Sequence, residues 1–575
     1  MTDFSKSFAN GYACLAAWSD LLDSINVFPV ADGDTGTNLR LSLSPLRDHQ
    51  QFDRTDTPGL LTSSAIGNSG NIASPFFRHF CSATGVHELA EKASLGREKA
   101  WQGIANPCSG TMLSVFDSLV SVLETHDEMT SIYGNLSREL QAAVKSTRQL
   151  LPDLQNAGVV DSGALGMYIF FDGFFRELTE QTGESESIFD LFSNSLSINS
   201  SFKQETSEDY CVDLLMQVEE QEDVVEESIA GLGESVVVVR DESVLKVHIH
   251  TPDPKTLRGQ LDNYGDIVHW SDEKIEQKNL HNNHPGEKPY FHIITDGAGS
   301  LTREMALDHG ISLLDSYIVT GESSRPESLC DPERIYHLML NGTRLTTAQA
   351  STFERHQHYR NLSRQFGRCL YLCVGSAFTG NYEIAKGWKK DNDPNDLFTV
   401  IDTGAASGRL ALIVLRVSRY NSSSHPPKDL LAIVDKVLGE CKEYVFIDEL
   451  KYLVAGGRVS RAKGFFGDLL HMKPVISPTS SGVEKMGVVR SRKGQLAFAV
   501  EVLTENFDGT AAPIVMLQYS DNKEWVESRV QAEMRRLLPQ AEILLTPLSL
   551  TSGVHMGPGT WSMAFSPPLC SDICS

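Results

Sequence analysis

The chain has 575 residues, of which 41% are hydrophobic and 22% are charged. These values are close to those of globular proteins, so they exclude a mainly disordered or fibrous protein, and a length of this size predicts three or four domains at roughly 150 residues each. The formal net charge of -25 repels phosphate backbones and indicates that nucleic acid is not a partner.

Apolar residues at helical spacing dominate the first part of the chain. Segments 17–25, 110–124 and 165–178 carry them every three or four residues, and few segments alternate as strands do. Residues 1–185 are therefore predicted to form an all-helical domain. The polar segment 186–206 has few large apolar residues and is interpreted as a linker.

The next segment, 207–285, changes to alternating periodicity. Its predicted order is strand, helix, strand, strand, helix, strand, which is typical of the split ferredoxin-like α+β fold. The strands are expected at 210–218, 235–240, 244–250 and 266–270, and the helices at 221–233 and 253–265.

Residues 288–575 are predicted to form the third domain. Strands such as 290–296 and 369–375 alternate with helices such as 381–390 and 407–420. Alternation of this kind indicates a mostly parallel α/β sheet that is covered by helices.

We expect the protein to be cytoplasmic. The first thirteen residues lack the regions of a signal peptide, and no apolar run approaches the roughly 18 residues that span a bilayer. The ten cysteines follow no repeating framework, so reduced thiols are expected. The pairs Cys369/Cys373 and Cys570/Cys574 are interpreted as packed or incidental residues rather than metal sites.

Two aspartates lie close together in the sequence NVFPVADGDTGTN, residues 26–38. Asp32 and Asp34 are separated by one glycine, so both carboxylates can face one point, where a hard cation would offset their repulsion. An EF-hand is excluded because Thr37 stands where its glycine belongs and Leu43 where its bidentate glutamate belongs. Mg²⁺ usually shares its ligands with phosphates, so the pair predicts a nucleotide site.

Two glycine-rich loops support a phosphate partner. Residues 67–70 (GNSG) and 161–166 (DSGALG) each precede an apolar, helix-like run, where backbone N–H groups can bind anions. A plain helix connection is the alternative for each loop taken alone. Neither GxxxxGK[ST] nor the catalytic loop of protein kinases occurs, so the two commonest phosphoryl-transfer frameworks are excluded.

Four motifs carry a resemblance to a known family. NVFPVADGDTGTN, AIGNSGNIAS, PCSGTML and AGVVDSGALG occur in the order seen in the nucleotide-binding (DAK2) domain that dihydroxyacetone kinase (DhaL) shares with the bacterial fatty acid kinase FakA. The NVFP form resembles the fatty acid kinase branch. The resemblance implies a DhaL-like barrel of antiparallel helices that binds ATP with two Mg²⁺.

The same resemblance implies roles for individual residues. The implied Mg²⁺ ligands are Asn26, Asp32 and Asp34. The implied nucleotide-binding residues are Asn38, Ser69, Gly70, Thr111, Met112, Asp161 and Gly163. Ile66 departs from the pattern, because the family usually has arginine before GNSG, and this bears on how phosphate charge is balanced.

The segment VLKVHIH, residues 244–250, places His248 and His250 on one face of a strand. If Cys211 lies alongside, the three side chains make a set suited to Zn²⁺; the alternative is two solvent-facing histidines and a buried cysteine. YC and VHIHT resemble the FakA middle domain, which implies that Cys211, His248 and His250 hold structural zinc and that the protein forms a homodimer through this domain. No fourth ligand is identified.

The third domain resembles the DegV family, the fatty-acid-binding partner (FakB) of that kinase, over nearly its whole length. The motifs include RLTTAQAS, VGSAFTGNYEIA, FTVIDTGAASGRLAL and SGVHMGPGT. The resemblance implies a DegV fold with two subdomains, in which Thr347 and Ser376 bind a fatty acid carboxylate while Arg458 and His555 lie close to the head group. Ala348 replaces a usual serine, which bears only on the detailed hydrogen bonding.

These resemblances together predict a single-chain fatty acid kinase. Mg-ATP would phosphorylate the carboxylate of a long-chain fatty acid to give acyl phosphate and ADP, with Asp32 and Asp34 holding Mg²⁺. Arg458 and His555 are candidates to orient the carboxylate or to stabilise the developing charge. Expected further partners are an acyltransferase that accepts acyl phosphate and, transiently, the membrane. Transfer within one chain or between chains stays open.

Two alternatives are considered. One is a lipid-binding or regulatory protein with an inactive kinase half, which Ile66 favours. The other is a kinase for a hydroxyketone such as dihydroxyacetone, which would need a separate substrate domain with a histidine that captures the ketone; no segment resembles one.

Overall fold

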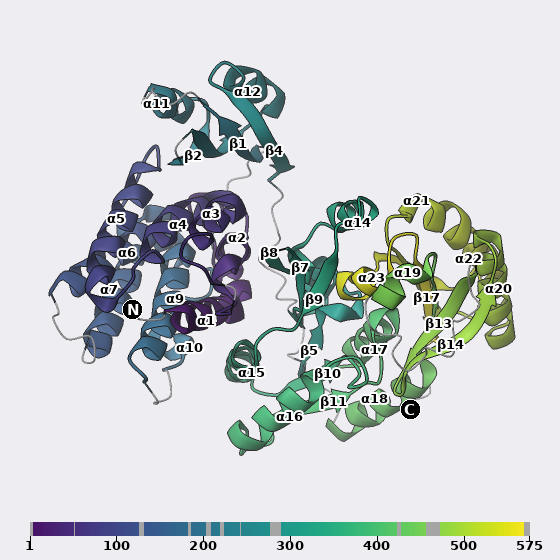
Figure 1. The fold of residues 1–575 in the computed structure, drawn as a ribbon. Helices are drawn as coiled ribbons and strands as arrows, with labels where there is room; N and C mark the ends of the chain where they lie inside the picture. Colours follow the sequence, from purple (N-terminus) through teal and green to yellow (C-terminus); the bar gives the residue numbers. More distant parts are fainter. Residues whose placement is uncertain are drawn as a thin grey trace. The chain divides into compact units, whose positions relative to one another are not determined.

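The computed structural model divides the chain into two compact units, Met1–His281 and Asn282–Ser575, each of which is described by itself (Figure 1). It describes residues 4–50, 52–125, 132–181, 186–199, 201–202, 209–218, 224–241, 243–275, 289–321, 323–421, 427–455 and 472–568.

The first unit begins with a helical part, which confirms the prediction of a helical amino-terminal region. Its helices are α1 (Ser5–Ser24), α2 (Thr35–Ser42), α3 (Thr57–Ser64), α4 (Gly67–Phe80), α5 (Leu89–Gln102), α6 (Met112–Thr125), α7 (Ile132–Leu150), α8 (Pro152–Ala157), α9 (Ser162–Leu178) and α10 (Ile188–Leu191). The last of these lies inside the segment predicted as a linker, where Phe192 is buried against Tyr168.

Helix α9 is apolar on nearly all sides and packs along α1. Glycines make this close approach possible. A Cβ atom at Gly173 would lie 2.8 Å from the Cys14 sulfur, and one at Gly11 would lie 2.8 Å from the Phe170 carbonyl oxygen. Both distances are too short for real side chains, so any larger residue would push the two helices apart.

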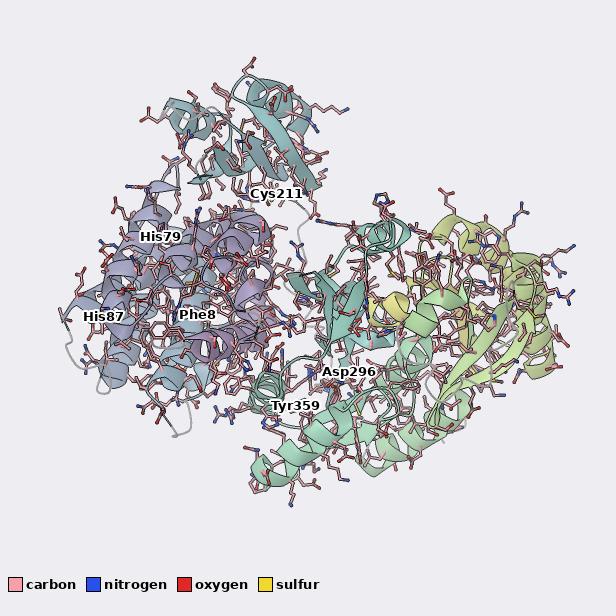
Figure 2. All side chains as sticks on the ribbon, in the orientation of Figure 1. Phe8, His79, His87, Cys211, Asp296 and Tyr359 are labelled. Atoms are coloured by element: carbon pink, nitrogen blue, oxygen red, sulfur yellow. The ribbon has the colours of Figure 1, made fainter. Side chains whose placement is uncertain are left out.

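Stacked phenylalanines fill the core between the helices. Phe76 of α4 is fully buried and stacks on Phe116 of α6 with ring centroids 4.1 Å apart, and Phe171 of α9 meets it edge-on at 5.7 Å. Phe8, within the same bundle, packs on Phe174 (Figure 2). Large aromatic side chains thus join four helices in one core.

The remainder of the first unit is an antiparallel sheet with two helices. Its elements are β1 (Tyr210–Gln217), α11 (Val224–Ala230), β2 (Glu234–Asp241), β3 (Val244–Thr251), α12 (Pro254–Leu261) and β4 (Asp266–Lys274), and the strand order is β2-β3-β1-β4. Alternate residues such as Val212, Val247 and Ile249 pack with Leu257 of α12 in one apolar cluster. The opposite face of the sheet is polar.

The outer edge of β2 pairs with the segment that follows α5. The Ala105 amide donates to the Val236 carbonyl at 3.1 Å, and the Val238 amide donates to the Gly103 carbonyl at 2.7 Å. This bridge fixes the sheet against the helical part, and it brings β2 next to the residues that precede α6.

The second unit has the α/β character that the sequence predicts, and its described residues form three sheets. The strands are β5 (His292–Asp296), β6 (Ile311–Leu314), β7 (Tyr317–Thr320), β8 (Ser323–Pro326), β9 (Leu345–Ala348), β10 (Cys369–Cys373), β11 (Phe398–Asp402), β12 (Lys442–Phe446), β13 (Lys473–Thr479), β14 (Gly482–Val489), β15 (Ile514–Tyr519), β16 (Glu542–Pro547) and β17 (Trp561–Ser566). The sheet orders are β11-β10-β5-β6, β14-β13-β12-β17-β15-β16 and β8-β7-β9.

Helices cover these sheets (Figure 1). They are α13 (Arg303–Asp308), α14 (Pro332–Leu340), α15 (Thr352–Phe366), α16 (Asn381–Asn392), α17 (Ser407–Tyr420), α18 (Pro427–Glu440), α19 (Leu450–Ala455), α20 (Arg492–Asn506), α21 (Lys523–Trp525), α22 (Ala532–Leu537) and α23 (Leu550–Met556). Helix α17 is buried between the four-stranded and six-stranded sheets, and its apolar residues share one core with both.

The prediction of a mostly parallel sheet is right for only one of the three. The four-stranded sheet is parallel, but in the six-stranded sheet only β15 and β16 run parallel. The other pairs are antiparallel. Strands β13 and β14 form a hairpin through a two-residue turn, and β17 pairs antiparallel with both β12 and β15. Among the described residues, no helix has both the length and the apolar character needed to cross a bilayer.

The aromatic core makes Phe76→Ala a strongly destabilising change. Removing the ring leaves a cavity that Phe116 and Phe171 cannot fill, so the free energy of unfolding of the first unit should fall by about 3–5 kcal/mol. Differential scanning calorimetry would show this as a lower transition temperature. Leu95→Ala, on the exposed side of α5, is the control and should change that free energy by less than about 0.5 kcal/mol. An unchanged transition for Phe76→Ala would contradict this account of the core.

Candidate functional site

A pocket of about 290 Å³ lies in the first unit where four helices begin. Its lining includes residues from the first turns of α2, α4, α6 and α9, namely Thr35, Asn68, Ser69, Met112, Ser162 and Gly163. Backbone N–H groups in the first turn of a helix have no partner within the helix, and the helix dipole adds partial positive charge there. Four such ends at one pocket make it a strong site for an anion.

The residues that precede these helices differ in how they cap them. Asp34 precedes α2 and Ile66 precedes α4, and neither side chain accepts a hydrogen bond from its own helix. Asp161 precedes α9 and does accept one, from the Ala164 amide at 2.7 Å. Burial raises the pKa of Asp161 to about 7, against the lowering effect of its backbone hydrogen bonds.

The acidic loop lies directly before α2. Gly33, between the two aspartates, has a φ of 67°, a left-handed conformation that favours glycine. The Asn26 amide donates to Asp32 Oδ1 at 2.6 Å, and the Ser162 hydroxyl donates to Asn26 Oδ1 at 3.4 Å. Asn26 therefore connects the acidic loop to the start of α9. The predicted Mg²⁺ residues Asn26, Asp32 and Asp34 and the start of α9 thus lie together.

Most of the predicted nucleotide-binding residues line this pocket. They are Ser69, Thr111, Met112, Asp161 and Gly163. Asn38 and Gly70 lie behind it instead. A Cβ atom at Gly70 would sit 2.0 Å from the Ser42 hydroxyl, and one at Gly67 would sit 2.0 Å from the Asn38 amide nitrogen. These two positions pack α2 closely against α4.

Other pocket residues were not predicted from the sequence. Ile104 and Asn106 come from the segment that pairs with β2, and Ser235 and Val236 come from β2 itself. Their place in the pocket depends on the bridge between that segment and the sheet, which no local pattern reveals. Cys108 belongs to the PCSGTML motif, which does carry a local signal.

The polar face of the sheet holds a cysteine and two histidines in one group. The Cys211 sulfur lies 3.8 Å from His248 Nδ1, and His248 Nε2 lies 3.2 Å from His250 Nε2. One candidate ligand atom from each residue lies within 4.8 Å of the others. Both histidines are buried, so the alternative of solvent-facing histidines is wrong. Figure 2 shows Cys211 on the side of the sheet towards the helices.

The chemistry of this group fits a zinc ion. Burial, and then the charge of His248, lower the pKa of His250 to about 4, so its imidazole is neutral and can bind a metal. Burial, together with nearby carboxylates that include Asp213 and Asp34, raises the pKa of the Cys211 thiol above its ordinary value. A bound cation would offset these negative charges, and one thiolate with two imidazoles is a donor set that suits Zn²⁺.

Asp213, two residues after Cys211, lies on the same face and was missed. Its carboxylate lies 3.4 Å from His248 Nδ1 and 3.8 Å from Lys246 Nζ, and it accepts hydrogen bonds from Gly67 and Asn71 of α4. Burial alone would raise its pKa, but the neighbouring His248 and Lys246 charges and the hydrogen bonds lower the pKa of Asp213 to about 2. The two-residue repeat of a strand would have indicated this placement.

In the second unit, two of the predicted substrate residues contact each other. The side chains of Thr347, on β9, and His555, on α23, are joined by a hydrogen bond of 3.0 Å between Oγ1 and Nε2. Ser376 is exposed on the loop after β10, where its backbone amide donates to Asp402 Oδ1 at 3.0 Å. Arg458 lies outside the described residues.

Buried Asp296 holds the start of the loop that carries Ser376. Its carboxylate accepts from the Val374 amide at 2.8 Å, from the Tyr371 hydroxyl at 2.8 Å and from the Asn381 amide at 2.8 Å. Arg355 supplies the opposite charge at 3.2 Å. Figure 2 labels Asp296 in this unit. These contacts therefore hold the first residue of the loop, Val374, in place.

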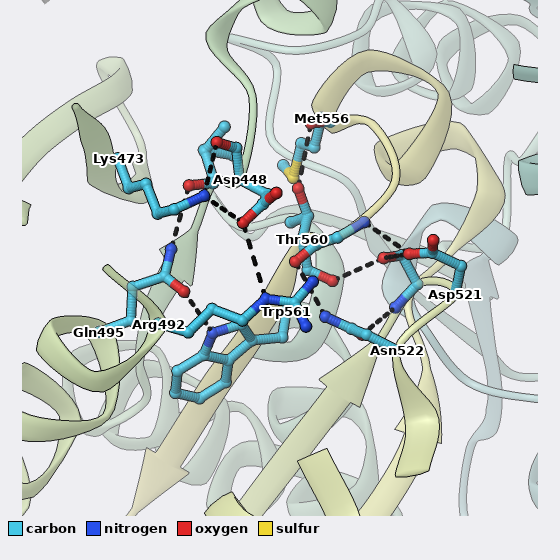
Figure 3. Close-up of polar contacts among 12 residues, drawn as sticks. Asp448, Lys473, Arg492, Gln495, Asp521, Asn522, Met556, Thr560 and Trp561 are labelled. Atoms are coloured by element: carbon cyan, nitrogen blue, oxygen red, sulfur yellow. Dashed lines mark hydrogen bonds and ion pairs between the residues drawn. The ribbon is translucent and has the colours of Figure 1, made fainter. Parts of the chain in front are cut away.

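The loop after α23 is held by a polar network (Figure 3). Asp521 accepts from the Gly559 amide at 2.5 Å, and Asn522 donates to the Gly559 carbonyl at 2.9 Å. The Thr560 hydroxyl donates to the Met556 carbonyl at 3.0 Å. Beside this loop, Asp448 forms an ion pair with Lys473. These contacts fix the end of the helix that carries His555.

The start of α23 is held by a buried carboxyl group. Glu327 Oε2 accepts from the Thr551 amide at 2.9 Å, and Glu327 Oε1 accepts from the Ser316 amide at 3.4 Å. Burial, together with the negative charge of Asp315, raises the pKa of Glu327 to about 7. Both ends of α23 are thus fixed, and so is the position of His555.

Three family models match the chain in succession. A DAK2 domain model matches residues 29–176, a model of the FakA-like fatty acid kinase middle domain matches residues 207–284, and the DegV family model matches residues 290–568. The fusion of these three kinds of domain in one chain, which the sequence predicts, is confirmed.

Curated relatives are similar over part of the chain. Protein YloV of Bacillus subtilis (strain 168) is 27% identical over 366 residues, which cover 56% of this chain and 66% of that protein. A protein of Staphylococcus saprophyticus is 28% identical over 347 residues, or 54% of this chain and 62% of that protein. The match therefore spans less than two thirds of each relative's length.

Solved structures are similar to about half of the chain. A fatty acid binding protein, DegV from Bacillus subtilis, covers 49% of this chain and all (100%) of its own, with 19% identity and a TM-score of 0.45. A stearic acid-binding protein from Eubacterium ventriosum covers 48% of this chain and 98% of its own, with 20% identity and a TM-score of 0.44.

Glu327 should make the stability of the second unit depend on pH. Its pKa is raised from 4.5 to about 7 on folding, so the folded protein binds the proton more tightly than the unfolded chain. The stabilisation is therefore complete below pH 4.5 and is lost as the pH rises towards 7, by an amount on the order of 3 kcal/mol. Thermal unfolding of the wild type and of Glu327→Gln across this range would measure it.

The difference in stability between wild type and Glu327→Gln should shift in favour of the glutamine variant as the pH rises. Glu524→Gln, at an exposed position of the same unit, is the matched control and should follow the wild type throughout. Parallel curves for wild type and Glu327→Gln between pH 4.5 and 7 would show that this carboxyl group does not titrate as described.

Proposed function

We propose that the chain is a fatty acid kinase, which transfers the γ-phosphoryl group of Mg-ATP to the carboxylate of a long-chain fatty acid and releases acyl phosphate and ADP. One observation carries the proposal. The starts of four helices meet at one pocket, and the acidic loop with Asp32 and Asp34 lies beside it. The matches to the DAK2 domain and to the FakA-like middle domain support the same function.

Helix starts and an acidic loop at one pocket would suit the phosphates and the Mg²⁺ of a nucleotide. Phosphate oxygens would face the helix starts, where N–H groups such as those of Asn68 and Ser69 can donate to them. Asn26, Asp32 and Asp34 would hold Mg²⁺ on the side of the acidic loop. When bound, the ion neutralises charge on the phosphate oxygens, which is the main requirement of phosphoryl transfer.

The carboxylate acceptor would come from the DegV-like unit. A carboxylate inside a protein requires hydroxyl donors or a cation, because leaving it unpaired costs several kcal/mol. Thr347 and His555 already contact each other and can share such a ligand, with Ser376 and Arg458 as further candidates. A carboxylate is a nucleophile at neutral pH, so no general base is required.

The finer description of the protein is part of this proposal. The helical part would be a DhaL-like barrel, the sheet that follows would be a ferredoxin-like domain with structural zinc at Cys211, His248 and His250, and the protein would be a cytoplasmic homodimer. Fusion in one chain gives the two halves an effective concentration of about mM where the connection is flexible. Transfer between the two chains of a dimer is equally compatible with this arrangement.

One observation favours a second function, a lipid-binding protein without kinase activity. Ile66 precedes α4 and offers no charge to a phosphate, and its backbone amide donates to the Ser42 hydroxyl at 3.1 Å. In that case, the pocket would bind a nucleotide without turnover, or none at all. Turnover that depends on fatty acid separates the two functions.

Purified protein with Mg-ATP and oleate should form an acyl phosphate that hydroxylamine traps as a hydroxamate. Asp32→Asn should lower this rate by ~100-fold or more, because the loss of a carboxylate weakens the Mg²⁺ site that balances phosphate charge.

Thr347→Val should weaken binding of a fluorescent fatty acid while leaving ATP binding intact.

Asp153→Asn is the matched control for the acidic loop, since it makes the same chemical change at an exposed position of α8. It should react as the wild type does. If the wild-type protein binds oleate yet consumes no ATP when oleate is added, the kinase assignment fails and the lipid-binding function takes its place.

The protein purified without chelator should contain zinc in stoichiometric amount. Cys211→Ser and His250→Ala should each lose most of it, because three ligands cannot be reduced to two without a large loss of affinity. Plasma mass spectrometry of the dialysed proteins gives the metal content. Cys330→Ser, which alters a cysteine of the other unit, should keep its zinc. A wild-type chain that takes up no zinc on titration would rule out the metal site.

A further inference from the structure

We propose that Asp213 is a positioning residue that links the Cys211–His248–His250 group to the first turn of α4, so that metal bound in the sheet orders this GNSG turn at the pocket. The inference deepens the proposed function and rests on it, because it assigns the metal centre a part in nucleotide binding. It concerns residues that the structure describes on both sides of the link.

Strand register places Asp213 at the metal group. In the ladder between β1 and β3, Cys211 lies opposite His250 and Asp213 lies opposite His248. Residues two apart on a strand point to the same face, so Asp213 faces the same way as the three candidate ligands. This is the face towards α4, opposite the apolar face that packs on α12.

The carboxylate of Asp213 contacts both the metal group and helix α4. Its Oδ2 atom accepts from the Gly67 amide at 3.0 Å and lies 3.4 Å from His248 Nδ1. Its Oδ1 atom accepts from the Asn71 side-chain amide at 2.9 Å. The residue is only 7% exposed, so water does not compete with these contacts.

The contacts on α4 fix the first turn of that helix. Gly67 has a φ of 64° and is the first residue of α4, and the Asn71 side chain also donates to the Gly67 carbonyl at 2.7 Å. Ile66, the residue before the helix, has no side chain that could cap it. Asp213 therefore caps α4 from a distant part of the chain, next to Asn68 and Ser69 of the pocket.

Lys246 stabilises the buried negative charge of Asp213. Its amine lies 3.8 Å from Asp213 Oδ1, and the residue is 5% exposed. A buried carboxylate is stable only with an opposite charge and hydrogen bonds, and Asp213 has both. The pair also offsets the negative charge close to the metal group.

The geometry of His248 carries the link to a metal. Its Nε2 atom lies 3.2 Å from His250 Nε2, whereas its Nδ1 atom lies 3.4 Å from Asp213 Oδ2 and 3.8 Å from the Cys211 sulfur. Histidines that bind metal through one ring nitrogen usually donate from the other to a carboxylate, which fixes the ring. Metal held through Nε2 would thus fix the ring of His248, the carboxylate of Asp213 and the amide of Gly67 in sequence.

Linkage makes the effect reciprocal. If the metal orders the GNSG turn and so strengthens nucleotide binding, the nucleotide strengthens metal binding by the same factor. A chain in which Ile66 supplies no charge to the phosphates depends more on the backbone of this turn. The order that Asp213 gives to the turn is then a direct contribution to the site.

The experiment uses the full chain with zinc bound and after removal of zinc by a chelator. Hydrogen exchange at residues 66–71 should be slower with zinc in the wild type and independent of zinc in Asp213→Asn. The affinity for Mg-AMPPNP, measured by calorimetry, should fall about 10-fold on zinc removal in the wild type. In Asp213→Asn it should be low in both states.

Glu226→Gln is the matched control, because its carboxylate pairs with Arg240 on the part of the sheet covered by α11. It should behave as the wild type does. Asn71→Ala is a milder second variant if Asp213→Asn does not fold; it removes one contact of Asp213 on α4 and should reduce the effect of zinc while zinc stays bound.

The outcomes separate the link from the kinase assignment. The link is supported if exchange at residues 66–71 is slower with zinc in the wild type and if this effect of zinc is lost or reduced in either variant. This holds even if the protein binds no nucleotide, because in that case only the proposed function fails. Exchange at 66–71 that does not respond to zinc in the wild type overturns the link, whatever the nucleotide does.

Discussion

The first unit depends on the meeting of four helix starts at one pocket. Helices α2, α4, α6 and α9 all begin there, and each brings amide groups that its own backbone cannot satisfy. Such an arrangement is unfavourable unless acceptors are supplied. Asp161 supplies one within the pocket wall, and Asp213 supplies another from the sheet. Asp23 supplies a third, because its Oδ1 atom accepts from the Thr37 amide at 2.9 Å.

Buried carboxylates have a corresponding part in the second unit. Asp296 holds the loop after β10, Glu327 holds the start of α23, and Glu443 accepts from the Gly408 and Arg409 amides at the start of α17. Each is placed where backbone amides would otherwise be left without partners. The loops and helices that carry Ser376 and His555 are therefore fixed by charge and hydrogen bonds as well as by packing.

The parts that the sequence predicted correctly have local causes. Helical spacing follows from 3.6-residue periodicity. The GNSG and DSGALG segments, which the sequence predicts as loops before helices, form the first turns of α4 and α9 instead. Alternation placed His248 and His250 on one face of a strand, whereas the addition of Cys211 rested on the resemblance to the FakA middle domain. The same two-residue repeat would have indicated Asp213. The missed features depend on pairing between distant segments. Ser235 and Val236 reach the pocket because β2 pairs with residues 103–105. The antiparallel direction of β17 is set by its pairing with β12 and β15, which are far from it in the sequence.

The pairing of residues 103–105 with β2 bears on how the chain can be divided. The segment belongs to the helical part, and it covers the outer edge of β2 as a partial fifth strand of the sheet. Cutting the gene between the helical part and the sheet would expose that row of amide and carbonyl groups on one fragment. Open strand edges of this kind invite association with other chains. The helical part thus shields its neighbour from aggregation, and the two are best expressed as one piece.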